Sequence, residues 1–202
     1  RHCSRGCRTG DSRRQPSAPS PVMNIPEIFF VFDVEAIGLH GQGFAVAGGV
    51  YRKDGLLFKE FAYHCPEGRA DGEWNDREWV KVNVTINSAS LLCTMPSEVR
   101  ECFWREWGDA KERYPDVVMA VECGWPVEAR FLIGCIQDNV MNRKWRGPYP
   151  LHEIASIMMA AGMDPMKQYE RLPNELPEHE PLADSRLSAR LLFEALHRLE
   201  AK

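Results

Sequence analysis

The sequence predicts one α/β domain in which helices flank a mixed β-sheet. Three observations lead to this prediction. Residues 27–63 hold three successive apolar, β-branched runs separated by glycine-containing turns, the pattern of antiparallel strands. Residues 97–121 hold a helical apolar pattern followed by a fourth buried strand, which indicates a parallel crossover onto the same sheet. Helical patterns dominate the rest of the chain.

Each predicted element rests on a local signal. In chain order we predict strands at 27–35, 44–52 and 56–63, a short helix near 74–80, a helix at 97–114, a strand at 116–121, a helix opened by Pro126, and helices at 151–162 and 185–199. Asp54-Gly55 favours a hairpin turn. Ser97 is a typical N-cap, and Pro115 ends the helix that Ser97 begins. The four prolines of residues 164–183 indicate a long loop.

Charge is distributed unevenly along the chain. Residues 1–24 are rich in Arg, Ser and Pro, so we expect a disordered extension before a domain that covers 25–202. A basic nucleic-acid arm, a transit peptide, or a segment upstream of a true start at Met23 are the alternatives. The whole chain has a net charge of −4, so the domain itself is acidic. An acidic domain argues against broad electrostatic DNA binding, but not against a nuclease whose carboxylates bind metal ions.

The cysteines and the hydropathy pattern limit the cellular context. The seven cysteines form no CxxC pair, which fits reduced thiols better than a disulfide framework or a zinc site. No apolar run approaches the roughly 20 residues of a membrane span. We therefore expect a cytoplasmic protein with no membrane partner.

Two carboxylates near the end of the first predicted strand are the main functional signal. Side chains alternate along a strand, so Asp33 and Glu35 point to the same face, roughly 6–7 Å apart. Their mutual repulsion calls for a cation, and a hard divalent metal is the natural candidate. The alternative is a strand that runs into a solvated acidic loop.

Two further acidic features follow in the chain. Glu128 precedes Phe131-Leu132 in the helix after the fourth strand, and His179 and Asp184 lie just before the last helix. In order and spacing these features resemble the 3′-to-5′ exonucleases of the DEDD superfamily that carry a histidine (DEDDh type), such as oligoribonuclease and RNase T. The pattern of that family is Asp-x-Glu, then Asp before Phe-Leu, then His-x4-Asp. Its fold is the ribonuclease H-like mixed sheet.

The resemblance implies a chemistry and a role for each residue. Asp33, Glu35, Glu128 and Asp184 would bind two divalent cations, Mg²⁺ or Mn²⁺, and His179 would be the general base. The backbone of Ala36, Ile37 and Gly38 would line the 3′-terminal nucleotide, with Ile37 beside its base. Trp125 is a candidate for stacking on a base, although a core aromatic is an equal alternative. Members of this family are often dimers, so the resemblance also implies a homodimer.

The resemblance has two departures. Residues 36–38 are Ala-Ile-Gly, where the family more commonly has Thr-Thr-Gly. The second acidic position holds Glu128 where the family has Asp, and Glu122 is an alternative without the Phe-Leu spacing. We expect a 3′-to-5′ exonuclease acting on single-stranded or short nucleic acid, with RNA slightly favoured over DNA. The departure at Glu128 leaves open a catalytically inactive nucleic-acid-binding or interaction protein on the same fold. A metal-dependent endonuclease is a third hypothesis. An ordinary loop histidine at 179, a solvated charge at 128 and a helix cap at 184 are the alternatives for single residues.

Overall fold

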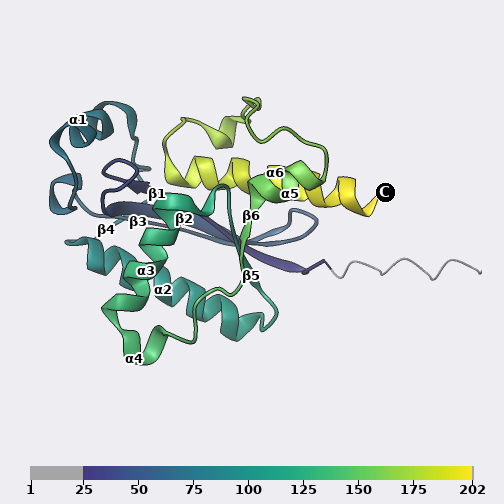
Figure 1. Ribbon diagram of the computed structural model, residues 1–202, viewed down its shortest axis with the longest axis horizontal. Helices are drawn as coiled ribbons and strands as arrows, with labels where there is room; N and C mark the ends of the chain where they lie inside the picture. Colours follow the sequence, from purple (N-terminus) through teal and green to yellow (C-terminus); the bar gives the residue numbers. More distant parts are fainter. Residues whose placement is uncertain (1–24, 202) are drawn as a thin grey trace, which may run out of the picture.

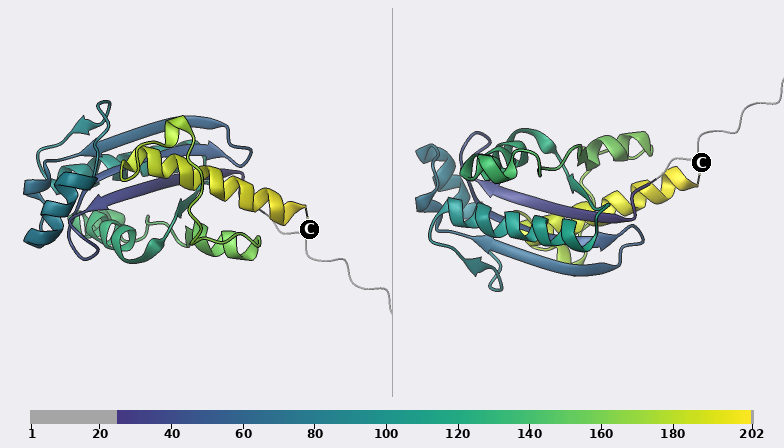
Figure 2. Two further views of the ribbon diagram at one scale, coloured as in Figure 1. Left: turned by 90° about the horizontal axis from the view of Figure 1, so that it is seen from above. Right: turned by 90° about the horizontal axis from the view of Figure 1, so that it is seen from below.

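A six-stranded sheet between two groups of helices forms the centre of the protein, for which a computed structural model describes residues 25–201 (Figure 1). The strand order is β4-β3-β2-β1-β5-β6. Figure 2 shows α5 and α6 on one face of this sheet and α2 and α3 on the other. The prediction for residues 1–24 lies outside the described residues.

The predicted mixed sheet is confirmed. The strands are β1 (Ile28–Ala36), β2 (Gly43–Arg52), β3 (Leu57–His64), β4 (Leu91–Leu92), β5 (Val118–Val121) and β6 (Leu151–Glu153). The first three strands are antiparallel, and β5 lies parallel to β1, as the crossover pattern indicated. The two short strands β4 and β6 extend the sheet in parallel at its edges.

The helices follow the predicted order, but several of their ends differ from the prediction, and one short helix at Val140–Arg143 was not predicted. They are α1 (Trp74–Asn83), α2 (Pro96–Arg113), α3 (Ala129–Asp138), α4 (Val140–Arg143), α5 (Ile154–Ala160) and α6 (Pro181–Glu200), with short 3₁₀ turns at Glu67–Arg69 and Pro173–Glu175. None of the helices within residues 25–201 combines the length and the apolar character that a membrane crossing requires.

Two predicted helix starts are wrong. Helix α2 begins at Pro96, and the Glu98 carboxylate rather than Ser97 accepts the nearby backbone N–H of Thr94, at 2.6 Å. Pro126 lies in the turn Gly124–Glu128, where helical backbone begins after the extended Trp125 and continues into α3, so the prediction that Pro126 opens this helix is confirmed. Residues 151–153 form β6 instead of the first turn of α5, because they pair with β5.

The start of α6 also differs from the prediction, and the difference affects the site. Helix α6 begins at Pro181, four residues before the predicted position. Its cap is Glu180, whose buried carboxylate accepts the backbone N–H groups of Leu182 and Ala183 at 3.2 and 2.8 Å. The alternative role of Asp184 as the helix cap is therefore wrong. Asp184 lies inside the first turn, where its carboxylate is free for other contacts.

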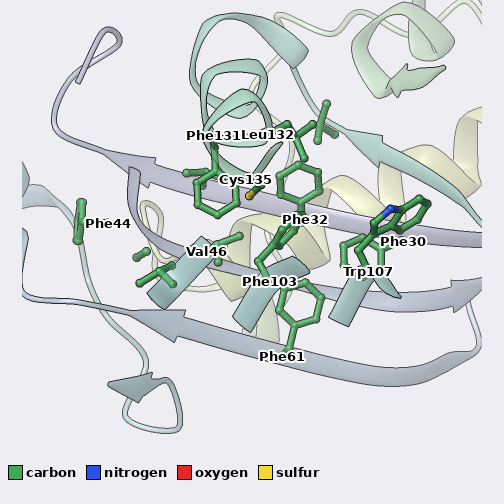
Figure 3. Packing of buried hydrophobic residues seen from close by; sticks show 14 of the residues in the cluster. Phe30, Phe32, Phe44, Val46, Phe61, Phe103, Trp107, Phe131, Leu132 and Cys135 are labelled. Atoms are coloured by element: carbon green, nitrogen blue, oxygen red, sulfur yellow. The ribbon is translucent and has the colours of Figure 1, made fainter. Parts of the chain in front are cut away.

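Alternation along β1 separates two hydrophobic cores. Phe30 and Phe32 pack against α2 and α3 in the cluster of Figure 3. Phe29 and Val31 point to the opposite face and pack with α5 and α6. Asp33 and Glu35 continue the second series, since side chains two residues apart share a face. The strand that fills both cores therefore directs its two acids toward α6.

Phe103 of α2 is the centre of the larger core. Its ring lies 4.8–6.0 Å, centroid to centroid, from the rings of Phe30, Phe32, Phe61 and Phe131. We expect Phe103→Ala to lower the free energy of unfolding by about 3–5 kcal/mol, because it leaves a cavity among rings that cannot collapse. Urea unfolding measures this loss. Phe58→Ala is the control, since Phe58 is 41% exposed, and an equal loss in both variants would contradict the assigned core.

Candidate functional site

Four carboxylates from distant parts of the chain meet at the end of β1. Burial raises the pKa of Asp33 well above its ordinary value, and the charges of Glu35, Glu128 and Asp184 raise it further. Glu122, at the end of β5, adds to the same effect. Mutual repulsion of this kind requires the charges to be close. The structure thus brings together all four acids that the sequence singled out.

His179 lies next to two of these acids. One potential ligand atom from each of Glu35, His179 and Asp184 falls within 4.8 Å of the other two. The backbone carbonyl of His179 accepts the N–H of Thr85 at 2.9 Å, and the imidazole meets the ring of Trp79 edge to face at 5.1 Å. No closing movement of the loop is needed to bring His179 to the carboxylates.

Local sequence explains how the two acids of β1 fit at this position. Asp33 lies opposite Ala47 on β2, and Glu35 lies opposite Ala45. Both alanines are fully buried. Because their side chains are small, the two carboxylates have space on this face of the sheet. The register shifts after Glu35, so the chain turns away from the sheet at Ala36. The acids are therefore the last side chains on this face before the loop.

The electrostatics of the site are those of crowded, partly buried anions. Burial, followed by the charges of Asp184 and Glu128, raises the pKa of Glu35 to about 7. Burial also raises the pKa of Glu128 to about 7, although backbone hydrogen bonding opposes part of this rise. Burial raises the pKa of Asp184, and Arg171 lowers it in part. Each shift means that the folded protein disfavours the negative charge at that residue.

Arg171 supplies part of the missing positive charge. Its Nη1 donates to Oδ1 of Asp184 at 2.5 Å and to the carbonyl of Glu175 at 2.9 Å. Among the four acids, Arg171 contacts Asp184 alone. It therefore does not compensate the negative charges of Asp33, Glu35 and Glu128. Carboxylate oxygens at several positions are the donor set that hard divalent cations prefer, so the residues present fit Mg²⁺ or Mn²⁺.

Glu122 is a weaker member of the group than Glu128. The hydroxyl of Ser188 on α6 donates to Oε2 of Glu122 at 3.2 Å, and the residue is otherwise exposed. Glu128 is more buried, and its charge also acts on Glu35. The charge of Glu128 therefore raises the pKa of both Asp33 and Glu35, whereas the charge of Glu122 raises the pKa of Asp33 alone of these two.

A cleft of about 440 Å³ opens beside Glu35. It is lined by Val34, Glu35, Ala36, Gly38, Leu39, Asp76, Trp79 and Val127. Ala36 and Gly38 line this cleft. The Ile37 side chain is completely buried in the core, so the prediction that it lies beside a base is wrong. Leu39, two residues further, is an exposed apolar residue that lines the cleft.

Trp125 also differs from its expected surroundings. It is 73% exposed and does not line the cleft, so the alternative of a core aromatic is wrong. Its backbone is extended within the turn before α3, which directs the chain out of the core at this point.

Sequence analysis missed three residues of the site. Asp76 and Trp79 lie three residues apart on α1, so they share one face of that helix, but nothing in the sequence places this face over β1. Arg171 lies in the proline-rich loop with no local signal. Long-range contacts position all three.

Comparisons with known proteins give a distant structural likeness. No family model matches the chain, and a search of curated proteins found no match. Among solved structures, the chain is similar to cell-death related nuclease 4 (CRN-4), with 13% sequence identity and a TM-score of 0.47. The likeness covers 85% of this chain and 64% of that nuclease, so it spans less than two thirds of the nuclease. A likeness this distant does not decide function, which must come from the chain's own residues.

Repulsion in the site leads to a prediction about Glu128→Gln. A carboxyl whose pKa is about 7 in the folded protein and near 4.5 in the unfolded chain costs stability above pH 4.5, and the full cost is reached above pH 7. In the presence of a chelator near pH 8, Glu128→Gln should raise the free energy of unfolding by about 1–3 kcal/mol. Near pH 4.5 the gain should almost disappear. Urea unfolding at both pH values measures it.

Glu112→Gln on the exposed side of α2 is the matched control for this experiment and should change little at either pH. Mn²⁺ should stabilise the unsubstituted protein more than Glu128→Gln, because binding to the folded state alone raises its stability. A Glu128→Gln variant that is less stable than the unsubstituted protein near pH 8 would contradict the assigned repulsion.

Proposed function

We propose that this chain is a metal-dependent 3′-to-5′ exonuclease that hydrolyses phosphodiester bonds in single-stranded or short nucleic acid. The observation that carries the proposal is the meeting of Asp33, Glu35, Glu128 and Asp184 beside His179, at the mouth of an open cleft. Clustered carboxylates with a neighbouring imidazole suit hydrolysis of a phosphodiester, where negative charge develops on the attacking and leaving oxygens.

The carboxylates hold the cations in this proposal. Two divalent cations, bound by Asp33, Glu35, Glu128 and Asp184, would stabilise the charge that develops on both oxygens. The raised pKa values of Glu35 and Glu128 support this role, because a bound cation would compensate the charge that burial makes costly. Arg171 donates a hydrogen bond to Asp184, which offsets part of its charge and holds its carboxylate in place.

His179 accepts the proton from the attacking water in this proposal. Imidazole is the commonest general base at neutral pH. The side chain is exposed to incoming solvent, lies beside Glu35 and Asp184, and is held by the ring of Trp79. A general base must be fixed within hydrogen-bond reach of the proton it accepts, and contacts on two sides of the residue supply that fixation.

The cleft receives the 3′-terminal nucleotide. Trp79, Leu39 and Val127 provide apolar surface for a base, and Ala36 and Gly38 bring backbone close to the sugar. Stacking on an aromatic ring does not depend on base identity, which suits an enzyme that removes every nucleotide in turn.

Trp125 is a further candidate for stacking, outside the cleft. A homodimer and a cytoplasmic location belong to the same proposal.

A catalytically inactive nucleic-acid-binding protein is the second candidate function. Glu128 is one methylene longer than the Asp of the resembled family, and Arg171 already contacts one oxygen of Asp184. Both features would weaken cation binding if they misplace or occupy ligand atoms. This candidate predicts that oligonucleotides bind without being digested.

Digestion of labelled oligonucleotides separates these functions. Single-stranded RNA and DNA carrying a 5′ label are incubated with Mg²⁺ or Mn²⁺, and the products are resolved by length. We expect a ladder that shortens from the 3′ end and disappears with a chelator. Binding without digestion in either metal would favour the inactive protein. Cleavage of circular substrates would indicate an endonuclease instead.

Asp33→Ala should abolish digestion and leave the fold intact or slightly more stable. The charges of Glu35, Glu128, Asp184 and Glu122 all act on Asp33, so removing the Asp33 carboxylate lowers the repulsion in the site. The same substitution removes a carboxylate that is proposed to bind the cations. Digestion rates and thermal unfolding in a chelator measure the two effects. Asp116→Ala is a control, because Asp116 is exposed on the loop before β5. Full retained turnover in Asp33→Ala would exclude the proposed active site.

His179→Ala should slow turnover by roughly 10²–10⁴-fold, the usual contribution of a general base. Calorimetric titration with Mn²⁺ should show nearly unchanged metal affinity, because the carboxylates remain. His197→Ala near the exposed end of α6 is the matched control and should have no effect. Equal losses of turnover and metal affinity would instead make His179 a metal ligand.

A further inference from the structure

Asp76 is an acid of the cleft that the proposed chemistry does not use. It lies in the first turn of α1, and its Oδ2 lies 2.1 Å from the position that a Cβ on Gly38 would take. Within residues 25–201 its carboxylate makes no hydrogen bond or ion pair. Gly38 has a φ of 70° and no side chain, so the Asp76 carboxylate can lie directly against the backbone after β1. The carboxylate and this backbone together form one wall of the cleft.

Several contacts fix Asp76 relative to the end of β1. The loop at 36–43 is tied to the segment before α1, because Gln42 N donates to the carbonyl of Asp71 at 2.7 Å. The backbone N–H of Asp71 donates in return to Oε1 of Gln42 at 3.0 Å. Gly72 packs so closely on Ile37 that a Cβ there would lie 2.2 Å from its Cγ2. Asp76 is therefore held at a set distance from Glu35.

The chemistry of a carboxylate limits what Asp76 can face. An ionised carboxylate accepts hydrogen bonds and donates none. It repels a phosphate, so the phosphate side of a nucleotide does not belong at this wall. In the proposed function the terminal base lies against the apolar surfaces of Trp79, Leu39 and Val127, which line the cleft. The neutral hydrogen-bond donors left on a nucleotide are the sugar hydroxyls, the exocyclic amines of three bases, and the ring N–H groups of guanine, uracil and thymine.

We propose that Asp76 accepts a hydrogen bond from the 2′-hydroxyl of the 3′-terminal nucleotide and so makes a ribonucleotide end the preferred substrate. The inference rests on the proposed function, because the sugar lies at this wall only when the terminal phosphodiester lies at the carboxylates. The 2′-hydroxyl is the group that distinguishes RNA from DNA. It is present whatever the base, whereas an amine is absent from uracil.

The test compares oligonucleotides that differ only in the 2′ substituent of a terminal uridine. The substituents are hydroxyl, fluorine and hydrogen, and only excision of that first nucleotide is timed. Fluorine keeps the sugar in the ribose conformation but donates no hydrogen bond. We expect the hydroxyl end to be removed about 10- to 100-fold faster than the fluorine end, the range for one hydrogen bond to a charged acceptor.

Variants show whether Asp76 is the source of the preference. In Asp76→Ala the ratio of the hydroxyl to the fluorine rate should fall to near one. Asp76→Asn, which keeps one acceptor oxygen, should retain part of it. Glu73→Ala is the matched control, since Glu73 is an exposed acid at the start of the same helix and makes no capping hydrogen bond. It should keep the full ratio.

Three results would overturn the inference. Equal rates on all three ends in the unsubstituted protein would show that no donor at the 2′ position is recognised. An equal fall on all ends in Asp76→Ala would show a structural role or a contact with the 3′-hydroxyl, which all three ends share. A changed ratio of terminal cytidine to uridine, with an unchanged hydroxyl-to-fluorine ratio, would show that Asp76 contacts the base instead.

Binding of 5′-UMP and 5′-dUMP, measured by calorimetry with Mn²⁺, separates failure of the inference from failure of the proposed function. If no oligonucleotide is digested but UMP binds more tightly than dUMP in an Asp76-dependent manner, the contact between Asp76 and the 2′-hydroxyl holds and the exonuclease proposal fails. If digestion proceeds with no preference for the 2′-hydroxyl, the exonuclease proposal holds and the inference fails. If neither digestion nor nucleotide binding occurs, both fail.

Discussion

Repulsion among the carboxylates at the end of β1 is the constraint on which the site depends. Burial and neighbouring charges hold the pKa of Asp33 far above its ordinary value and bring Glu35 and Glu128 to about 7. A folded protein keeps such a cluster at a cost in stability, which is the usual price of a prearranged functional site. Arg171 offsets part of the negative charge of Asp184. A divalent cation is the simplest group that would offset the charges of the other three carboxylates.

The fold turns this constraint into geometry through a few simple devices. Because β1 alternates its side chains, the series that begins with Phe29 and Val31 ends with Asp33 and Glu35 facing α6. Glu180 caps α6 and so places Asp184 in its first turn, directly above the sheet. The parallel strand β5 ends beside β1 and leads into the turn that carries Glu128. Ends of parallel strands at one sheet edge are where α/β proteins commonly bind ligands.

Local patterns predicted the sheet and its acids, but not the wall of the cleft. The continuous apolar run of residues 27–35 predicted a strand, and the alternation of side chains along a strand gave Asp33 and Glu35 a common face. The order and spacing of His179 and Asp184 matched the resembled family, although the predicted start of the last helix was four residues late. Ile37 was misjudged because a loop residue beside glycines gives no sign that Gly72 will cover it. Trp79 and Asp76 depend on how α1 docks over β1, and Arg171 on a loop folded back to α6. Contacts between distant segments have no local signature.

The central claim is that the four carboxylates bind divalent cations at one place. Anomalous X-ray diffraction from crystals soaked in Mn²⁺ tests it most directly, because the metal itself is located without assuming any activity. The account predicts anomalous density within bonding distance of Asp33, with the oxygens of Glu35, Glu128 or Asp184 completing the coordination. Well-ordered carboxylates without such density, at Mn²⁺ concentrations that saturate other metal-dependent nucleases, would contradict it.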